Sequence, residues 1–235
     1  MYYEGTYRIF PLGDSAVTID FGNVIDESIN KVVLFLFDHL TTHPLTCMVE
    51  VVPAYSSLTV HYNRIGLRKY LSHDQEVFAW LKEQLQDMLD GVIIPKSDHH
   101  KLVRIPVCYE KEFGTDIEKV AKLKDISVDD LIGFHVSKEY RVYMLGFLPG
   151  FAYLGQLDEH ISIPRKAVPA PVEAGSIGIA GSQTGIYPLN SPGGWQIIGR
   201  TPVKLFDPNN NEPVLLRAGD SVRFYPITRH EFENY

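Results

Sequence analysis

The chain has 235 residues, 45% of them hydrophobic and 22% charged, which is the composition of a globular protein that folds without disulfide staples. Its 29 Asp and Glu outnumber its 22 Lys and Arg, and the net charge of −7 argues against a nucleic-acid-binding surface, because phosphate neutralisation requires basic residues. The longest apolar run, 32–37, is too short to cross a bilayer, and the first residues lack the pattern of a signal peptide. Cys47 and Cys108 have no Cys-x-x-Cys partner, so we expect a protein of the reducing cytoplasm that does not span a membrane.

Residues 1–94 alternate between strand-like and helical patterns and predict an α+β domain. Runs rich in β-branched and aromatic residues predict strands at 7–10, 16–21, 46–52 and 57–62. Apolar periodicity predicts a helix over 26–40 and a second helix that starts at Ser72, which has capping-box spacing with Gln75.

The pattern breaks at residues 95–101, a short polar stretch that we interpret as an interdomain linker. Residues 102–235 then form the second predicted domain. It opens with a strand at 102–109 and two short helices at 115–124 and 127–135, each with cap spacing at its start: Thr115 with Glu118, and Ser127 with Asp130. Many brief strands separated by glycine and proline follow, ending with 222–225, and this series predicts a mostly-β domain that is either a β-barrel or a closed sandwich.

Glycine is concentrated in the second domain. Residues 146–202 hold 10 of the 18 glycines and 7 of the 15 prolines. Glycine permits positive φ and close approach of a ligand or of another chain segment, and proline stiffens turns. The segment is therefore either a set of tight barrel corners or a rigid binding surface.

Charge and side-chain chemistry favour a binding surface in this segment. Between 165 and 200 the basic residues are Arg165, Lys166 and Arg200, and the only acidic residue is Glu173. A basic, amide-rich patch suits a carboxylate or a phosphate. The residues that we assign to substrate or anion binding are Arg165, Lys166, Gly178, Gly181, Gln183, Thr184, Tyr187, Gly193, Gly194 and Trp195.

Several standard catalytic motifs are absent from the sequence. It has no P-loop, no G-x-G-x-x-G and no H-E-x-x-H, and Ser182 fails the G-x-S-x-G spacing of a nucleophile elbow. We therefore predict no metal site. Asp158 and Glu159 are the only acids between 141 and 166, so Asp158 serves either catalysis or an ion pair with Arg165. His135 ends a predicted helix, where it is expected to interact favourably with the helix C-terminus.

Long motifs in this segment resemble a known family. The string at 145–155 with Ile163-Pro164-Arg165-Lys166, and the strings at 175–188 and 191–202, are similar to the carboxyltransferase-domain family, as is the start at 7–14. Its members include one of the subunits of prokaryotic ATP-dependent 5-oxoprolinase, the sporulation histidine-kinase inhibitor of bacilli and a module of urea carboxylase. The resemblance covers the whole chain and implies an α+β N-terminal domain followed by a cyclophilin-like β-barrel.

The resemblance also implies a function. The 5-oxoprolinase member of this family works with a homologous C subunit and with an A subunit, and the complex hydrolyses 5-oxo-L-proline to L-glutamate with consumption of ATP. Asp158 and Arg200 are the residues that we assign to catalysis, and it stays open which chain of the complex holds ATP. The alternative is a regulatory inhibitor that binds a sporulation-type sensor histidine kinase, and a further alternative is carboxyl-transfer chemistry on urea-derived allophanate.

Overall fold

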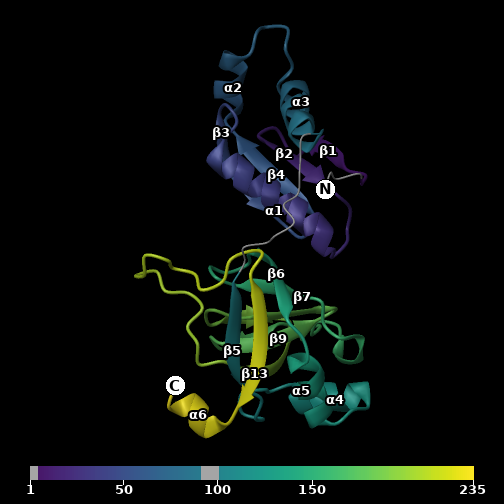
Figure 1. The fold of residues 1–235 in the computed structure, drawn as a ribbon, viewed down its shortest axis with the longest axis vertical. Coiled ribbons are helices and arrows are strands. Elements are labelled where there is room, and N and C mark those ends of the chain that lie inside the picture. The colour runs from purple at the N-terminus through teal and green to yellow at the C-terminus, as the bar shows by residue number, and fades with distance from the viewer. Residues whose placement is uncertain (1–4, 91–100) are drawn as a thin grey trace. The chain divides into compact units, whose positions relative to one another are not determined.

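The computed structural model describes residues 5–90 and 101–235, and the chain divides into two compact units, Met1–Asp98 and His99–Tyr235 (Figure 1). Residues 95–100 of the predicted linker lie outside the described residues. Each unit is built around its own hydrophobic core.

The N-terminal unit is a four-stranded antiparallel sheet with helices packed against it (Figure 1). Its strand order is β1-β2-β4-β3, with β1 at Arg8–Pro11, β2 at Ala16–Asp20, β3 at Met48–Pro53 and β4 at Ser57–Tyr62. The helices are α1 at Glu27–Thr42, α2 at Arg64–Tyr70 and α3 at Val77–Asp90. Val17 pairs with Val60 in register, and both side chains join the buried face that the helices cover.

Local capping interactions explain where two of these helices start. Asp26 accepts a hydrogen bond from the Ile29 N–H at 2.9 Å and starts α1, one residue from the predicted boundary. Asn63 accepts from the Gly66 N–H at 2.8 Å and starts α2, a helix that was not predicted from the sequence.

The predicted start of the next helix at Ser72 is wrong. Ser72 does bond the Gln75 side chain, at 3.0 Å between Ser72 Oγ and Gln75 Oε1, but α3 begins only at Val77. Arg68 donates to the Gln75 backbone oxygen at 2.5 Å and to the Ser72 backbone oxygen, so the intervening residues form a connection held by α2.

The C-terminal unit is a closed seven-stranded barrel, which confirms the predicted barrel. Its strand order is β10-β7-β6-β13-β5-β12-β9. The strands are β5 at Leu102–Cys108, β6 at Tyr140–Leu145, β7 at Ala152–Gly155, β9 at Ser176–Ala180, β10 at Gln183–Ile186, β12 at Gln196–Arg200 and β13 at Ser221–Ile227. Outside the barrel, β8 at Ala170–Val172 and β11 at Ser191–Gly193 form a separate two-stranded ribbon.

Two helices follow β5. Helix α5, Val128–Val136, starts at the predicted capping box of Ser127 and Asp130. Helix α4, Ile117–Lys124, starts after Asp116 without a side-chain cap, so the predicted cap at Thr115 is wrong. The Asp116 carboxylate instead accepts a hydrogen bond from the Ile197 N–H at 2.7 Å and so ties the helix start to β12.

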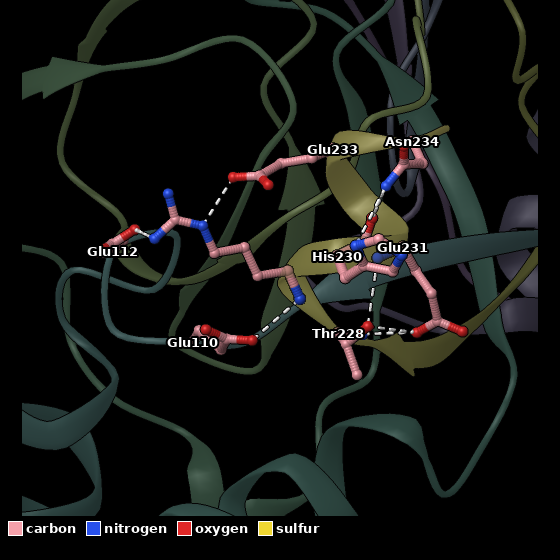
Figure 2. Close-up of polar contacts among 8 residues, drawn as sticks. Glu110, Glu112, Thr228, His230, Glu231, Glu233 and Asn234 are labelled. Atoms are coloured by element: carbon pink, nitrogen blue, oxygen red, sulfur yellow. Dashed lines mark hydrogen bonds and ion pairs between the residues drawn. The ribbon is translucent and has the colours of Figure 1, made fainter.

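The last described helix, α6 at Arg229–Glu233, is fixed by polar contacts (Figure 2). Thr228 and Glu231 form a capping box, with the Thr228 N–H donating to Glu231 Oε2 at 2.8 Å. Arg229 forms ion pairs with Glu112 at 2.6 Å and with Glu233 at 2.7 Å. These contacts attach the end of the chain to the segment that follows β5, at the surface of the barrel.

His135 lies inside the barrel, so its predicted role at the helix C-terminus is wrong. The residue is fully buried and stacks on Phe224 with 4.6 Å between ring centroids. Its Nδ1 lies 2.7 Å from the Tyr109 hydroxyl, and its Nε2 lies 3.0 Å from Thr184 Oγ1. Burial lowers the pKa of His135 to about 3, because the protonated ring would lose its hydration without gaining a carboxylate.

We predict that His135 makes folding stability fall in mild acid. In the unfolded chain the ring binds a proton near its ordinary pKa of 6.5, whereas the folded ring stays neutral down to about pH 3. Stability from this group is complete above pH 6.5 and is lost as pH falls through that window, by about 1.4 kcal/mol at about pH 5.5. Urea unfolding of the wild type and of His135→Gln at about pH 7.5 and pH 5.5 measures this, and the stability difference between the two should shrink at the lower pH. An identical pH dependence in both proteins contradicts the prediction.

Candidate functional site

A second, smaller core lies on the outer face of the barrel. Ile177 and Ile179 of β9 point into the barrel core, so Gly178 and Ala180 between and beyond them face outward. An aromatic cluster packs there, consisting of Phe151, Tyr187 and Trp195, with Val172, Ala180 and Ile197 around it. The ring of Phe151 meets Tyr187 and Trp195 edge-on, at centroid distances of 5.1 and 5.6 Å.

Three glycines of the glycine-rich segment make room for these rings. Gly178 pairs with Gly185 across β9 and β10, and a Cβ on either residue would lie 2.9 or 3.0 Å from Trp195 side-chain atoms. A Cβ on Gly193 would lie 2.5 Å from the Tyr187 hydroxyl oxygen. These three glycines therefore allow aromatic rings to pack directly against the backbone.

The other predicted residues of the site have separate positions. Gly181 takes a positive φ of 57° at the turn between β9 and β10, and its N–H donates to the Ile163 oxygen at 2.7 Å. Thr184 lies on the inner side of the barrel, where its hydroxyl donates to the Gly178 oxygen at 3.1 Å and meets His135. Gln183 is half-buried at the start of β10, and a Cβ on Gly194 would meet only the Lys166 oxygen, at 3.8 Å.

Two of the three predicted cations are neutralised by carboxylates. Lys166 Nζ lies 2.5 Å from Asp116 Oδ2, and both side chains are largely buried. Arg200 pairs with Glu173 and donates through Nε to the Ala174 oxygen at 2.9 Å. Neither residue offers an unpaired charge to a ligand in this conformation.

Arg165 differs from the other two cations. Its guanidinium lies 5.9 Å from the centroid of the Trp195 ring, and within residues 5–90 and 101–235 it forms no ion pair. Burial raises the pKa of Tyr153 and of Tyr187, and the positive charge of Arg165 opposes this rise in pKa at both hydroxyls. The field of Arg165 therefore covers the aromatic cluster and favours an anion there.

Phe147 also contacts this cluster, although it was not assigned to the site from the sequence. Its ring lies edge-on to Phe151 and Tyr187, at centroid distances of 5.6 and 6.5 Å, yet 63% of the residue is exposed. Its backbone has a φ of 68°, which is rare outside glycine. The available signal was an aromatic residue between Gly146 and Gly150, where the chain turns sharply.

Asp158 acts locally in the structure. It begins the short 3-10 helix η1, Glu159–Ile161, by accepting from the His160 N–H at 3.0 Å, and it pairs with His160 Nδ1 at 2.6 Å. These hydrogen bonds hold the pKa of Asp158 below its usual value. Its partner is thus His160 and not Arg165, the ion-pair partner considered from the sequence.

The described residues contain neither a membrane-spanning helix nor a metal cluster. No helix in those two ranges is long and apolar enough to span a membrane. Nor does the described part of the chain bring together three or more His, Cys, Asp or Glu side chains that could hold a metal ion.

Comparisons with known proteins agree along nearly the whole chain. A family model described as carboxyltransferase domain, subdomain C and D, matches residues 7–216. The B subunit of 5-oxoprolinase from Bacillus subtilis (strain 168) is 43% identical over 231 residues, which cover 97% of this chain and 96% of that protein. The B subunit of 5-oxoprolinase from Haemophilus influenzae is 51% identical over 179 residues, or 75% and 78% of the two chains.

Solved structures give the same fold. The crystal structure of TTHA0988 superposes with a TM-score of 0.75 at 34% identity, and the match covers 94% of this chain and 40% of that longer chain. The urea amidolyase of Kluyveromyces lactis superposes with a TM-score of 0.72 over 97% of this chain and 15% of that chain. Its 20% identity shows a shared fold alone.

We predict that Gly178→Ala destabilises the protein, whereas Gly194→Ala does not. The added methyl at Gly178 would lie 2.9 Å from the Trp195 Cβ and 3.2 Å from Tyr187 Cε2, and such overpacking costs about 1–3 kcal/mol. The methyl at Gly194 meets only one atom within 4 Å, so its effect should stay within about 0.5 kcal/mol. Denaturant unfolding of both variants measures the difference, and equal stabilities would show that the cluster is loosely packed.

Proposed function

The chain belongs to the family of carboxyltransferase domains, subdomains C and D, and we propose that it is the B subunit of an ATP-dependent 5-oxoprolinase. The observation that carries this proposal is the similarity to the B subunit of the Bacillus subtilis 5-oxoprolinase, which extends over nearly the full length of both chains. The complex hydrolyses 5-oxo-L-proline to L-glutamate with consumption of ATP. The partners that we propose are a homologous C subunit and an A subunit.

The chemistry of this reaction needs a site that favours anions. A five-membered lactam is a stable amide, and water adds to its carbonyl only when the developing negative charge is stabilised. The substrate also carries a carboxylate. In this chain the exposed guanidinium of Arg165 beside Trp195 is suited to a carboxylate, because it combines an unpaired charge with a partly dry aromatic neighbourhood.

The residues of this surface do not fit a nucleoside triphosphate by themselves. A triphosphate needs several cations or a backbone nest, and two of the three cations here already bind Asp116 and Glu173. The Gly181 N–H, which the glycine-rich turn would offer to a nest, is bonded to Ile163. ATP use is therefore proposed for the complex as a whole, and no step of the reaction is assigned to ATP on this surface.

Asp158 and Arg200 are the catalytic groups that we propose from sequence. In the structure each has a local partner that would have to be exchanged for substrate: His160 for Asp158, and Glu173 for Arg200. Arg165 needs no such exchange. It is therefore the first cation to test.

The function is tested by leaving this chain out of a reconstituted complex. The chain is co-expressed with its candidate A and C subunits, and glutamate formation from 5-oxoproline is measured with and without ATP. We expect ATP-dependent glutamate formation with all three chains and, without this one, a loss of roughly tenfold or more, the effect of removing about 1.4 kcal/mol of transition-state stabilisation. Equal activity without this chain would contradict the enzymatic role, and inhibition of a sensor histidine kinase would be the function to test next.

The three candidate residues are separated by single variants in the same assay. Arg165→Ala should lower kcat/KM by about 10- to 100-fold, because a hydrogen bond between charged groups is worth about 1.5–3 kcal/mol. Arg200→Ala and Asp158→Asn should lower it less, because Glu173 and His160 already hold these two side chains in the structure. Asn also keeps the backbone cap at residue 158, so the fold of that variant should stay intact. Loss of activity in Arg200→Ala alone, with folding intact by circular dichroism, would show that Arg200 and not Arg165 binds the anion.

A further inference from the structure

We propose that Phe147 and Arg165 form a binding surface for a small ring that carries a carboxylate, with Phe147 contacting the ring and Arg165 pairing with the carboxylate. The use of 5-oxoproline as one probe rests on the proposed function. The binding surface goes beyond that function in two respects. Phe147 selects for a ring, and a ring carboxylate binds whether or not the complex hydrolyses it.

The first observation is that both residues border the same buried rings. Phe147 lies edge-on to Phe151 and Tyr187. Phe151 in turn lies edge-on to Trp195, and the Arg165 guanidinium lies 5.9 Å from the centroid of the Trp195 ring. Tyr187 itself is held by packing, because it is buried, lies edge-on to Phe151 and packs its ring against Gly193. A rigid aromatic base thus holds one exposed aromatic ring and one exposed cation in a common neighbourhood.

The second observation is the backbone of Phe147. A φ of 68° is strained for any residue with a Cβ, and glycine would adopt it freely. The exposed ring leaves apolar surface in water, so the folded chain gains little from it. Both costs are offset if the ring covers the apolar face of a bound molecule.

The third observation concerns charge. The surface offers Arg165, and the neighbouring Lys166 is already paired with Asp116. One guanidinium matches one carboxylate in a bidentate pair. In the proposed mode the ring beside that carboxylate contacts Phe147, whereas acetate has no ring to make this contact. The ring and the charge should therefore contribute separately to affinity.

Binding is measured on the full chain by following the indole N–H signals in NMR. The chain has two tryptophans, and Trp80→Phe assigns the signal of Trp195. The probes are 5-oxoproline, cyclopentanecarboxylate, which lacks the lactam, 2-pyrrolidinone, which lacks the carboxylate, and acetate, which lacks the ring. We expect the two ring carboxylates to shift the Trp195 signal and to bind roughly tenfold more tightly than 2-pyrrolidinone or acetate, because each of the latter loses one of the two contacts.

Three variants assign the contacts. Phe147→Ala should weaken the ring carboxylates roughly tenfold and leave acetate unchanged, whereas Arg165→Ala should weaken every carboxylate. Phe147→Gly should weaken binding as Phe147→Ala does, while being no less stable, because glycine accepts the positive φ. Leu123→Ala is the control, since Leu123 is also highly exposed, at 64%, and lies in α4.

The outcomes separate the binding surface from the proposed function. Tight binding of cyclopentanecarboxylate that depends on Phe147, without 5-oxoproline turnover in the complex, would support the surface and reject the enzyme. Turnover of 5-oxoproline in the complex, together with an unchanged affinity of Phe147→Ala for the ring carboxylates, would reject the binding surface and leave the proposed function standing. The surface is also rejected if no ring carboxylate shifts the Trp195 signal, or if Arg165→Ala only disrupts assembly of the complex, which would mean that a protein carboxylate is the partner of Arg165.

Discussion

The packing of Trp195 on the glycine backbone of β9 and β10 is the constraint on which the candidate site depends. A ring can approach two neighbouring strands this closely only where both lack a Cβ, as at Gly178 and Gly185. The barrel behind these strands is filled by Ile177, Ile179 and other aliphatic side chains, so the strands cannot recede. The indole is therefore held rigidly, and Arg165 and Phe147 are positioned relative to a fixed surface.

The charge distribution shows why a basic stretch of sequence is a weak guide to an anion site. Arg165, Lys166 and Arg200 look equivalent in the sequence, but folding brings Asp116 from the start of α4 to Lys166 and sets Glu173 against Arg200. Only contacts between distant segments decide which cation keeps its charge available. The same folding leaves Arg165 on an aromatic ring, which attracts the guanidinium without neutralising it.

Local sequence signals led to good predictions where the governing interaction is local. The strand 57–62, the cap at Ser127 and the closed barrel follow from side-chain alternation, capping chemistry and turn spacing. The predicted start at Ser72 failed because Arg68, which lies outside the motif, binds the Ser72 and Gln75 backbone oxygens. The predicted cap at Thr115 failed because α4 starts after Asp116, whose carboxylate binds the Ile197 N–H.

The candidate site could be predicted only in part, because strand register decides which side chains face it. Arg165 and Trp195, which the sequence assigns to ligand binding as a cation and an aromatic residue of the glycine-rich segment, lie together in the structure. Thr184 was misjudged, since β10 turns it toward His135 inside the barrel, while Gly185 beside it faces the cluster. A one-residue shift in a strand exchanges its two faces, and the sequence pattern of this short strand does not fix that shift.

The polar side chains inside the barrel are separate from the cations near the outer aromatic cluster, and under the proposed function this separation explains why the chain works with partners. The interior network of Tyr109, His135 and Thr184 is sealed, and burial lowers the pKa of His135 so far that it stays neutral, so this network offers neither a charge nor an accessible base. Near the outer cluster, Lys166 and Arg200 each hold a local carboxylate partner. A lactam hydrolysis that consumes ATP needs several cations and a base at one place. Within the described residues, Arg165 lies on Trp195 of this cluster without an ion pair. One such charge suits a carboxylate but is too little to complete the reaction, so under the proposed function the remaining groups come from the other chains of the complex.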